Sequence, residues 1–158
     1  MPSGPFAHVC ILVHDLDRAI EDWSKILGVL DPQQLEERIV RYDAFEGGDD
    51  QMAWATFVSH GGCEIQFMQP SPDTPLGRRL AKVGEHVHHL CFTTDDPEDA
   101  ARRLAERGLT TGQISEDPTM PWQRWTWVMP DSAHGTLVEI ARPYRAVDGR
   151  WVDGSASD

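Results

Sequence analysis

Four side chains, placed in matched positions of two repeats, could hold a divalent metal ion. His8 and His89 occur in similar stretches, FAHVCILVHDL and HVHHLCFTTDD, and Gln66 and Glu139 each lie in mid-strand, four residues before a proline. Two imidazoles, an amide oxygen and a carboxylate make a mixed nitrogen and oxygen donor set, which suits a first-row divalent ion and differs from the thiolates of a structural zinc site. A six-coordinate ion would keep two open positions, which could chelate two neighbouring substrate oxygens and stabilise an enolate.

The repeat predicts two βαβββ modules. Aligning His8 with His89 without a gap also brings Asp15 onto Asp96, and each aspartate stands where a helix N-cap is expected. The fold class is therefore expected to be α+β, with paired βαβββ modules that form a cupped mixed sheet. We expect one domain over residues 1–158, made of a first module of about 6–70, a linker of 71–85, a second module of about 86–143 and a tail of 144–158.

Hydrophobic periodicity and turn residues place the elements within this frame. Helices are predicted after Asp15, after Thr74 and after Asp96 or Asp95, because a capping residue precedes an apolar stripe or a proline suited to the first helical position. The tail after Tyr144 is acidic and becomes rich in Gly and Ser, so we expect it to fray. The predicted strands are residues 8–13, 37–45, 52–58, 64–70, 87–94, 109–114, 123–128 and 136–141.

Strand alternation predicts which way the four candidate ligands point. Side chains alternate between the two faces of a strand, so each candidate lies opposite its apolar neighbours, which can take the helices. A curved sheet would then gather all four side chains in one concavity. His88 neighbours His89 in the chain but falls on the face of Leu90 and Phe92, so it is predicted to be structural or exposed.

The overall composition excludes several classes of function. The formal net charge is −12, and no Lys or Arg cluster is flanked by aromatic residues, so nucleic acid is not expected as a partner. No apolar run reaches membrane-spanning length, and the start MPSGPF lacks the pattern of a signal peptide, so we expect a cytoplasmic protein that binds no membrane.

These motifs resemble the vicinal oxygen chelate superfamily, which includes glyoxalases, extradiol dioxygenases and bleomycin-resistance proteins. Within it, QPSPDTPLGRRLAKVGEHVHHLCFTTDD and MPDSAHGTLVEI look most similar to the methylmalonyl-CoA epimerases. The resemblance implies one divalent ion (Co, Mn, Ni, Zn or Fe), a small-molecule substrate and a homodimer. It also implies that Glu139 is both a metal ligand and the catalytic proton acceptor. The implied metal ligands are His8, Gln66, His89 and Glu139.

Two features depart from the epimerases. The segment DPTMPWQRWTWVMP holds Trp122, Trp125 and Trp127, which could line an apolar substrate pocket, and the strand MAWATFV offers no glutamate as a second acid or base. The favoured function is a metal-dependent epimerase, isomerase or lyase that removes a proton next to a carbonyl. Two alternatives stay open. One is a non-haem Fe(II) ring-cleaving dioxygenase, and the other is a metal-free binding protein of the resistance type.

Overall fold

Each half of the chain folds as a βαβββ unit. The computed structural model describes residues 4–47 and 50–155. The first unit consists of β1 (Phe6–Leu12), α1 (Leu16–Leu30), the 3-10 turn η1 (Pro32–Leu35), β2 (Val40–Gly47), β3 (Asp50–Phe57) and β4 (Glu64–Pro70). The linker forms α2 (Pro75–Val83). The second unit consists of β5 (His86–Thr93), α3 (Pro97–Glu106), β6 (Ser115–Asp117), β7 (Met120–Val128), the 3-10 turn η2 (Pro130–Ser132) and β8 (Val138–Ala141).

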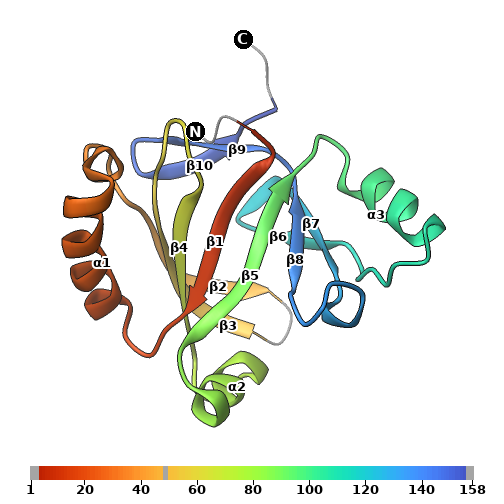
Figure 1. Cartoon of the computed structure of the whole chain (residues 1–158), viewed down its shortest axis with the longest axis horizontal. Helices are drawn as coiled ribbons and strands as arrows, with labels where there is room; N and C mark the ends of the chain where they lie inside the picture. Colours follow the sequence, from red (N-terminus) through yellow and green to blue (C-terminus); the bar gives the residue numbers. More distant parts are fainter. Residues whose placement is uncertain (1–3, 48–49, 156–158) are drawn as a thin grey trace.

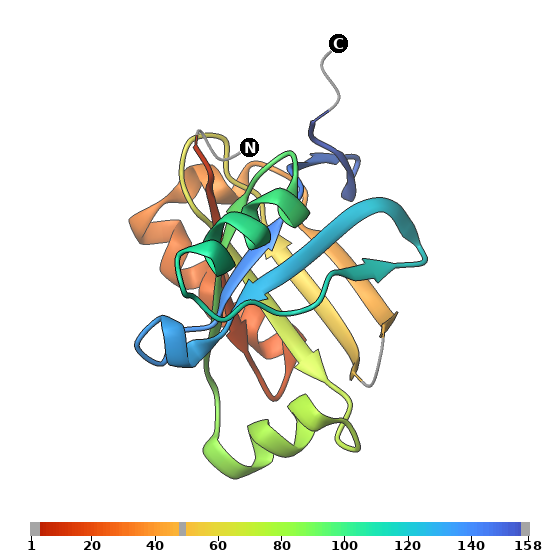
Figure 2. The same cartoon turned by 90° about the vertical axis from the view of Figure 1, so that its right-hand side faces the viewer.

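The two units join edge to edge into one mixed sheet. Its strand order is β2-β3-β4-β1-β5-β8-β7-β6, so β1 and β5 meet at the centre and each unit repeats the same arrangement on its own side. β1 runs parallel to β4 and β5 runs parallel to β8, whereas β1 and β5 are antiparallel. The sheet curls until its two edge strands, β2 and β6, approach each other (Figures 1 and 2). The predicted α+β fold with a cupped mixed sheet is confirmed.

The helix starts are those that the sequence predicts. The side chains of Asp15, Thr74 and Asp96 each accept a hydrogen bond from the backbone N–H three residues later, which satisfies a donor that the first helical turn leaves free. After α3 the chain turns at Gly108, whose φ of 85° favours glycine. None of the helices in residues 4–47 and 50–155 has the length and apolar character needed to span a bilayer.

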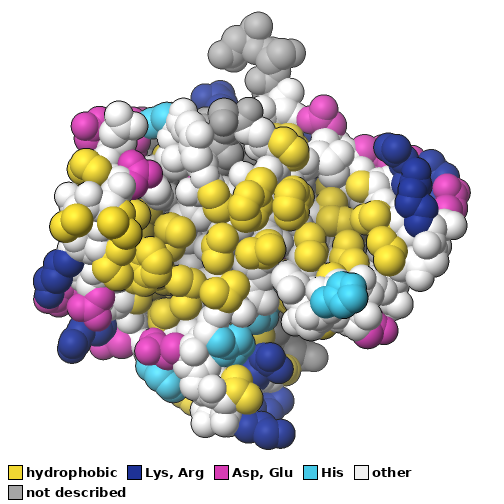
Figure 3. Space-filling model, viewed as in Figure 1, with side chains coloured by type: hydrophobic (Ala, Val, Ile, Leu, Met, Phe, Trp, Pro, Cys, Tyr) yellow, Lys and Arg dark blue, Asp and Glu magenta, His cyan; other side chains and the backbone are white. Residues whose placement is uncertain are grey.

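The helices cover the flanks of the sheet's outer face, not its centre. α1 packs against β3 and β4, where Trp23 meets Phe67 at a ring distance of 5.9 Å, and α3 packs against β7 and β8. Over β1 and β5, between these two helices, apolar side chains gather at the surface (Figure 3). Phe6 and Phe92 stack there at 4.9 Å and remain 38% and 39% exposed. The expectation that the helices would take the apolar face of every strand is therefore wrong for the two central strands.

The strand predicted at 109–114 is also wrong. These residues make only an isolated bridge, between Thr111 and Val128, and the short edge strand β6 follows at Ser115–Asp117. Gly112 lies against the Trp127 side chain, where a Cβ atom would come within 3.3 Å of the indole. The stretch therefore runs beside β7 through a single bridge and does not form a strand.

The tail does not fray over the residues that the structure describes. It forms a hairpin of β9 (Tyr144–Val147) and β10 (Arg150–Asp153), and residues 156–158 lie outside the described part. Tyr144 and Trp151 are each only 7% exposed. The backbone N–H of Trp151 donates to the Tyr42 hydroxyl at 3.0 Å, and the Arg150 guanidinium lies 4.7 Å from the centre of the Tyr42 ring. Burial of two aromatic rings thus outweighs the polar composition on which the prediction rested.

Candidate metal centre

The predicted ligands come from four adjacent strands at the centre of the sheet. The strand register explains how they meet: Cys10 pairs with both Gln66 and His89, and Cys91 pairs with both His8 and Glu139. Each buried cysteine therefore lies between one candidate from the first unit and one from the second. The four are His8 on β1, Gln66 on β4, His89 on β5 and Glu139 on β8.

Three of the four side chains converge on one point. His89 Nε2 lies 2.7 Å from Glu139 Oε2, His8 Nε2 lies 3.2 Å from His89 Nε2, and His8 Nε2 lies 3.8 Å from Glu139 Oε2. Two ligands at right angles, each about 2.1 Å from one ion, would be about 3.0 Å apart. The observed separations bracket that value, so the donor atoms fit a single divalent cation.

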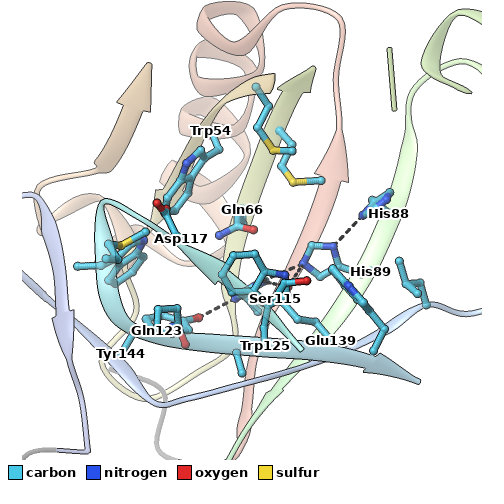
Figure 4. Close-up of a pocket in the computed structure, with 18 of the residues that line it drawn as sticks. Trp54, Gln66, His88, His89, Ser115, Asp117, Gln123, Trp125, Glu139 and Tyr144 are labelled. Carbon is cyan, nitrogen blue, oxygen red and sulfur yellow. Dashed lines mark hydrogen bonds and ion pairs between the residues drawn. The ribbon is translucent and has the colours of Figure 1, made fainter. Parts of the chain in front are cut away.

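Gln66 lies on the same side of the sheet but does not join this cluster. It is 9% exposed, and its amide nitrogen donates to Thr56 Oγ1 at 3.2 Å. Figure 4 shows the amide pointing into the cavity that holds His89 and Glu139. Because the amide nitrogen is used by Thr56, the amide oxygen is the group that remains for a cation.

The far sides of both imidazole rings are held by neighbours. Tyr144 Oη lies 2.6 Å from Nδ1 of His8, and His88 Nδ1 lies 2.8 Å from Nδ1 of His89. A ring whose Nε2 binds a cation must carry its proton on Nδ1, where a hydroxyl or a neutral imidazole can accept it. With a cation bound between the rings and Glu139, these two neighbours could accept the Nδ1 protons and leave both Nε2 atoms free to bind it.

The contact with His88 contradicts its predicted orientation. Cys10 pairs with His89, but the next residue, Ile11, pairs with Val87, so His88 is an extra residue in β5. Such a β-bulge interrupts the alternation of side chains. It turns His88 into the cavity beside His89, and burial lowers the pKa of His88 to about 3, with the nearby His89 charge adding to the effect.

Burial and mutual contact set the charges of the site. Desolvation lowers the pKa of His8 to about 3, although Glu139 opposes the change. For Glu139, burial acts to raise the pKa, but the contact with His89 and the nearby His8 outweigh it and hold the pKa below its usual value. At neutral pH the site thus offers a neutral His8 and an ionised carboxylate, the forms that bind metals.

A second buried carboxylate lies beside this centre. Glu64 is fully buried, and its Oε2 accepts a hydrogen bond from the Ser59 N–H at 2.9 Å. Burial raises its pKa to about 7, more than hydrogen bonds from Ser59 and Tyr144 lower it. The unfolded chain would release this proton near pH 4.5, so the folded chain holds one proton more between about pH 4.5 and 7. The contribution of protonated Glu64 to the stability of the fold is therefore lost as the pH rises from about 4.5 to 7.

Cys91 is a further donor that the sequence reasoning missed. Its sulfur lies within 4.8 Å of donor atoms of His8 and Glu139. Burial raises the pKa of its thiol well above 9, and the Glu139 charge raises it further, so without a cation the thiol stays protonated. Cys10 and Cys91 fall on each other when His8 is aligned with His89, and this match is the sequence signal that could have found Cys91.

The cluster lies at one wall of a cavity of about 570 Å³. Trp122, Trp125 and Trp127 of β7 line this cavity, and the Trp127 ring lies 5.2 Å from the His89 ring. Trp54 and Trp151 line it as well, although the sequence reasoning did not single them out. Figure 4 shows Trp54 and Trp125 bordering the space around Gln66.

The third strand adds no acid or base to the cavity. Its residues that line the space are Met52 and Trp54, and Trp54 is stacked on Tyr42 at 4.6 Å. Thr56 follows on the same face, where it accepts the hydrogen bond from Gln66. In the described part of β3, therefore, no carboxylate faces the candidate centre, as the sequence predicts.

Comparisons with known proteins agree with this fold. A variant of methylmalonyl-CoA epimerase from Streptomyces coelicolor, in complex with 2-nitronate-propionyl-CoA, is 24% identical, with a TM-score of 0.63 over 88% of this chain and 96% of that chain. The epimerase from Mycobacterium tuberculosis is 22% identical, with a TM-score of 0.65 over 90% and 92%. A hypothetical protein from Bacillus halodurans C-125 is 18% identical, with a TM-score of 0.65 over 92% and 99%. Identities this low show the shared fold alone.

A sequence comparison settles the family. The search of curated proteins gives no significant match. In contrast, the sequence model of the glyoxalase/bleomycin resistance protein/dioxygenase superfamily matches residues 7–119, which is more than half of the chain. This range contains His8, Gln66 and His89, and the strand order shows the paired βαβββ modules that the internal repeat predicted. The chain therefore belongs to the glyoxalase/bleomycin resistance protein/dioxygenase superfamily.

Proposed function

We propose that this protein is a divalent-metal-dependent enzyme that removes a proton from a carbon next to a carbonyl, as an epimerase, isomerase or lyase does. The observation that supports it is the convergence of His8, His89 and Glu139, with donor atoms 2.7–3.8 Å apart, on the wall of a 570 Å³ cavity. Gln66 is the fourth proposed ligand, through its amide oxygen. Epimerases that bind acyl-CoA ligands share this fold.

Glu139 is the proposed proton acceptor. When bound, a divalent ion would supply positive charge for two neighbouring substrate oxygens and lower the energy of an enolate. Both histidine contacts of Glu139 use Oε2, so Oε1 is left to take a proton. Because its pKa is held below the usual value, Glu139 is ionised at neutral pH and ready to accept.

Hydrogen exchange tests this assignment. The Zn²⁺-loaded and Co²⁺-loaded proteins are incubated in deuterated water with methylmalonyl-CoA and, separately, with 2-hydroxyacetophenone, which carries neighbouring oxygens on an aromatic ketone. We expect deuterium to enter the carbon next to the carbonyl of at least one probe, without oxygen uptake. Glu139→Gln should reduce exchange by orders of magnitude, because an amide cannot accept the proton.

Metal analysis provides the control for that variant. Exchange rates are compared per bound ion, since Glu139→Gln also removes a proposed ligand. Full exchange in a metal-loaded Glu139→Gln protein would remove Glu139 as the base. A wild-type protein that binds no ion under replete conditions would instead favour the metal-free binding protein.

A ring-cleaving dioxygenase is the second candidate, and the aromatic cavity favours it. His8, His89 and Glu139 provide the two-histidine, one-carboxylate set of non-haem Fe(II) oxygenases, and five tryptophans line the space beside them. Oxygen consumption by the Fe²⁺-loaded protein with a catechol, in the absence of deuterium exchange, would select this function.

We also propose that the protein is a homodimer. The proposal is supported by the apolar strip over β1 and β5, where the stacked Phe6 and Phe92 remain more than a third exposed. Analytical ultracentrifugation of the wild type and of Phe92→Asp measures the oligomeric state. A monomeric wild type would contradict the assignment.

A further inference from the structure

The cavity beside the candidate centre is walled by aromatic rings. Trp54 is stacked on Tyr42, and Trp151 packs edge-on against Tyr144 at 4.5 Å, so two of the indoles are held in place by a second ring. Fixed aromatic walls of this kind accept flat apolar molecules and attract cations to their faces. The five indoles are those of Trp54, Trp122, Trp125, Trp127 and Trp151.

The charged side chains among the described residues that line the cavity are all carboxylates. Its lining includes the carboxylates of Glu116, Asp117 and Glu139, and among the described residues it includes no lysine or arginine. Glu116 is exposed to solvent, and the Arg124 guanidinium, which also pairs with Glu98, lies 3.1 Å from it. Glu139 belongs to the candidate metal centre. The remaining negative charge is that of Asp117.

Asp117 is buried without a cationic partner. It is 4% exposed and lies at the end of β6, the edge strand that the curled sheet brings towards β2. Its Oδ1 accepts two hydrogen bonds from Thr119, at 2.8 Å from the backbone N–H and 2.7 Å from the hydroxyl. Within residues 4–47 and 50–155, no lysine or arginine forms an ion pair with it. A positive partner would stabilise a buried carboxylate, and a ligand bound in the cavity could provide one.

We propose that the cavity binds an aromatic ligand that carries a positive charge, with the ring between the tryptophans and the cationic group at Asp117. The end of the ligand away from Asp117 would carry two neighbouring oxygens that face His8, His89 and Glu139. Only this part of the proposal rests on the proposed function. An acyl-CoA does not meet these conditions, because its phosphates, and the free carboxylate of methylmalonyl-CoA, would enter a cavity without lysine or arginine among its described lining residues.

A matched pair of catechols tests the charge preference. Dopamine and dihydroxyphenylacetate share the same ring and chain length but carry opposite charges. Isothermal titration of the Zn²⁺-loaded protein should give a dissociation constant for dopamine about tenfold below that for the acid, the size expected of one partly desolvated charge contact. Coenzyme A, titrated in the same way, should give no binding at millimolar concentration.

Two variants test whether Asp117 is the source of the preference for dopamine over the acid. Asp117→Asn should reduce this preference to about twofold or less and leave the affinity for the acid unchanged or improved. Glu116→Gln, which removes an exposed carboxylate that already pairs with Arg124, should preserve most of the preference. Equal or reversed affinities in the wild type, a preference unchanged in Asp117→Asn, or no binding of either catechol would overturn the proposal.

The same titration of the metal-free protein separates this proposal from the proposed function. Asp117 and the tryptophans do not depend on a bound ion, so the preference for dopamine should persist there at lower overall affinity. If it persists while deuterium exchange and metal binding fail, the cavity assignment stands and the proposed function falls. If exchange succeeds but the acid or coenzyme A binds better than dopamine, the reverse holds.

Discussion

Replacing Tyr144 by phenylalanine tests whether the tail hairpin sets the tautomer of His8. The change removes one oxygen, which lies 2.6 Å from His8 Nδ1, and keeps the ring that packs against Trp151. Without this acceptor, the imidazole either buries an unsatisfied Nδ1–H or moves its proton to Nε2, towards Glu139. Either outcome opposes cation binding, because Nε2 is the atom that faces the site.

The expected loss follows from the burial of this contact. His8 is 3% exposed, so water cannot replace the hydroxyl, and an unsatisfied buried donor costs about 1–3 kcal/mol. Neighbours that orient metal-binding histidines are worth about 10–100-fold in metal affinity, a range that agrees with this cost. We therefore expect the dissociation constant for Zn²⁺ to rise by about 10–100-fold in Tyr144→Phe.

Tyr42→Phe provides the matched control. The Tyr42 hydroxyl accepts the Trp151 N–H at 3.0 Å, so the variant loses a hydrogen bond to the same hairpin without touching His8. Zn²⁺ affinity is measured by titration against a competing chelator, and thermal unfolding is followed in parallel. Tyr42→Phe should unfold at a lower temperature yet bind Zn²⁺ within about threefold of wild type. Wild-type affinity in Tyr144→Phe would refute the reasoning, and equal losses in both variants would assign the effect to the hairpin as a whole.

Three further predictions concern single side chains. Glu64→Gln should become more stable relative to the wild type as the pH rises from about 4.5 to 7, by about 3 kcal/mol, because the folded wild type keeps a proton on Glu64 that its unfolded chain releases. Denaturant unfolding at several pH values measures the difference in unfolding free energy, and a difference that does not change with pH would contradict the raised pKa. His88→Ala should weaken Zn²⁺ binding by about tenfold and His89→Ala should abolish it, as measured by chelator competition; equal effects would mean that His88 is itself a ligand. Trp125→Ala should keep its metal but change the relative affinities for dopamine and catechol in titration, and unchanged ratios would make the ring a core residue only.

Local sequence was enough to predict the fold class and, to within about three residues, most element boundaries. Asp15, Thr74 and Asp96 can be recognised as helix caps from local sequence, because the hydrogen bond that each accepts comes from a residue only three positions away. The internal repeat predicted two matched modules, since equivalent segments fold alike, but the order of the strands and their parallel and antiparallel pairs came from the structure. The same repeat was enough to name His8, His89, Gln66 and Glu139 as one candidate set.

Tertiary structure decided what surrounds that set. The bulge in β5 turns His88 beside His89, and it arises from pairing with β1, a strand far away in the chain, which no local alternation of residues reports. The polar tail folds back because Tyr144 and Trp151 find buried places against the sheet, so that the Tyr144 hydroxyl reaches His8. Asp117 is buried in the cavity only because the sheet curls and brings its two edges together. The bulge, the folded tail and the burial of Asp117 all depend on contacts between residues far apart in the chain. These contacts stabilise the fold only after the curled sheet has formed, so local sequence does not report them.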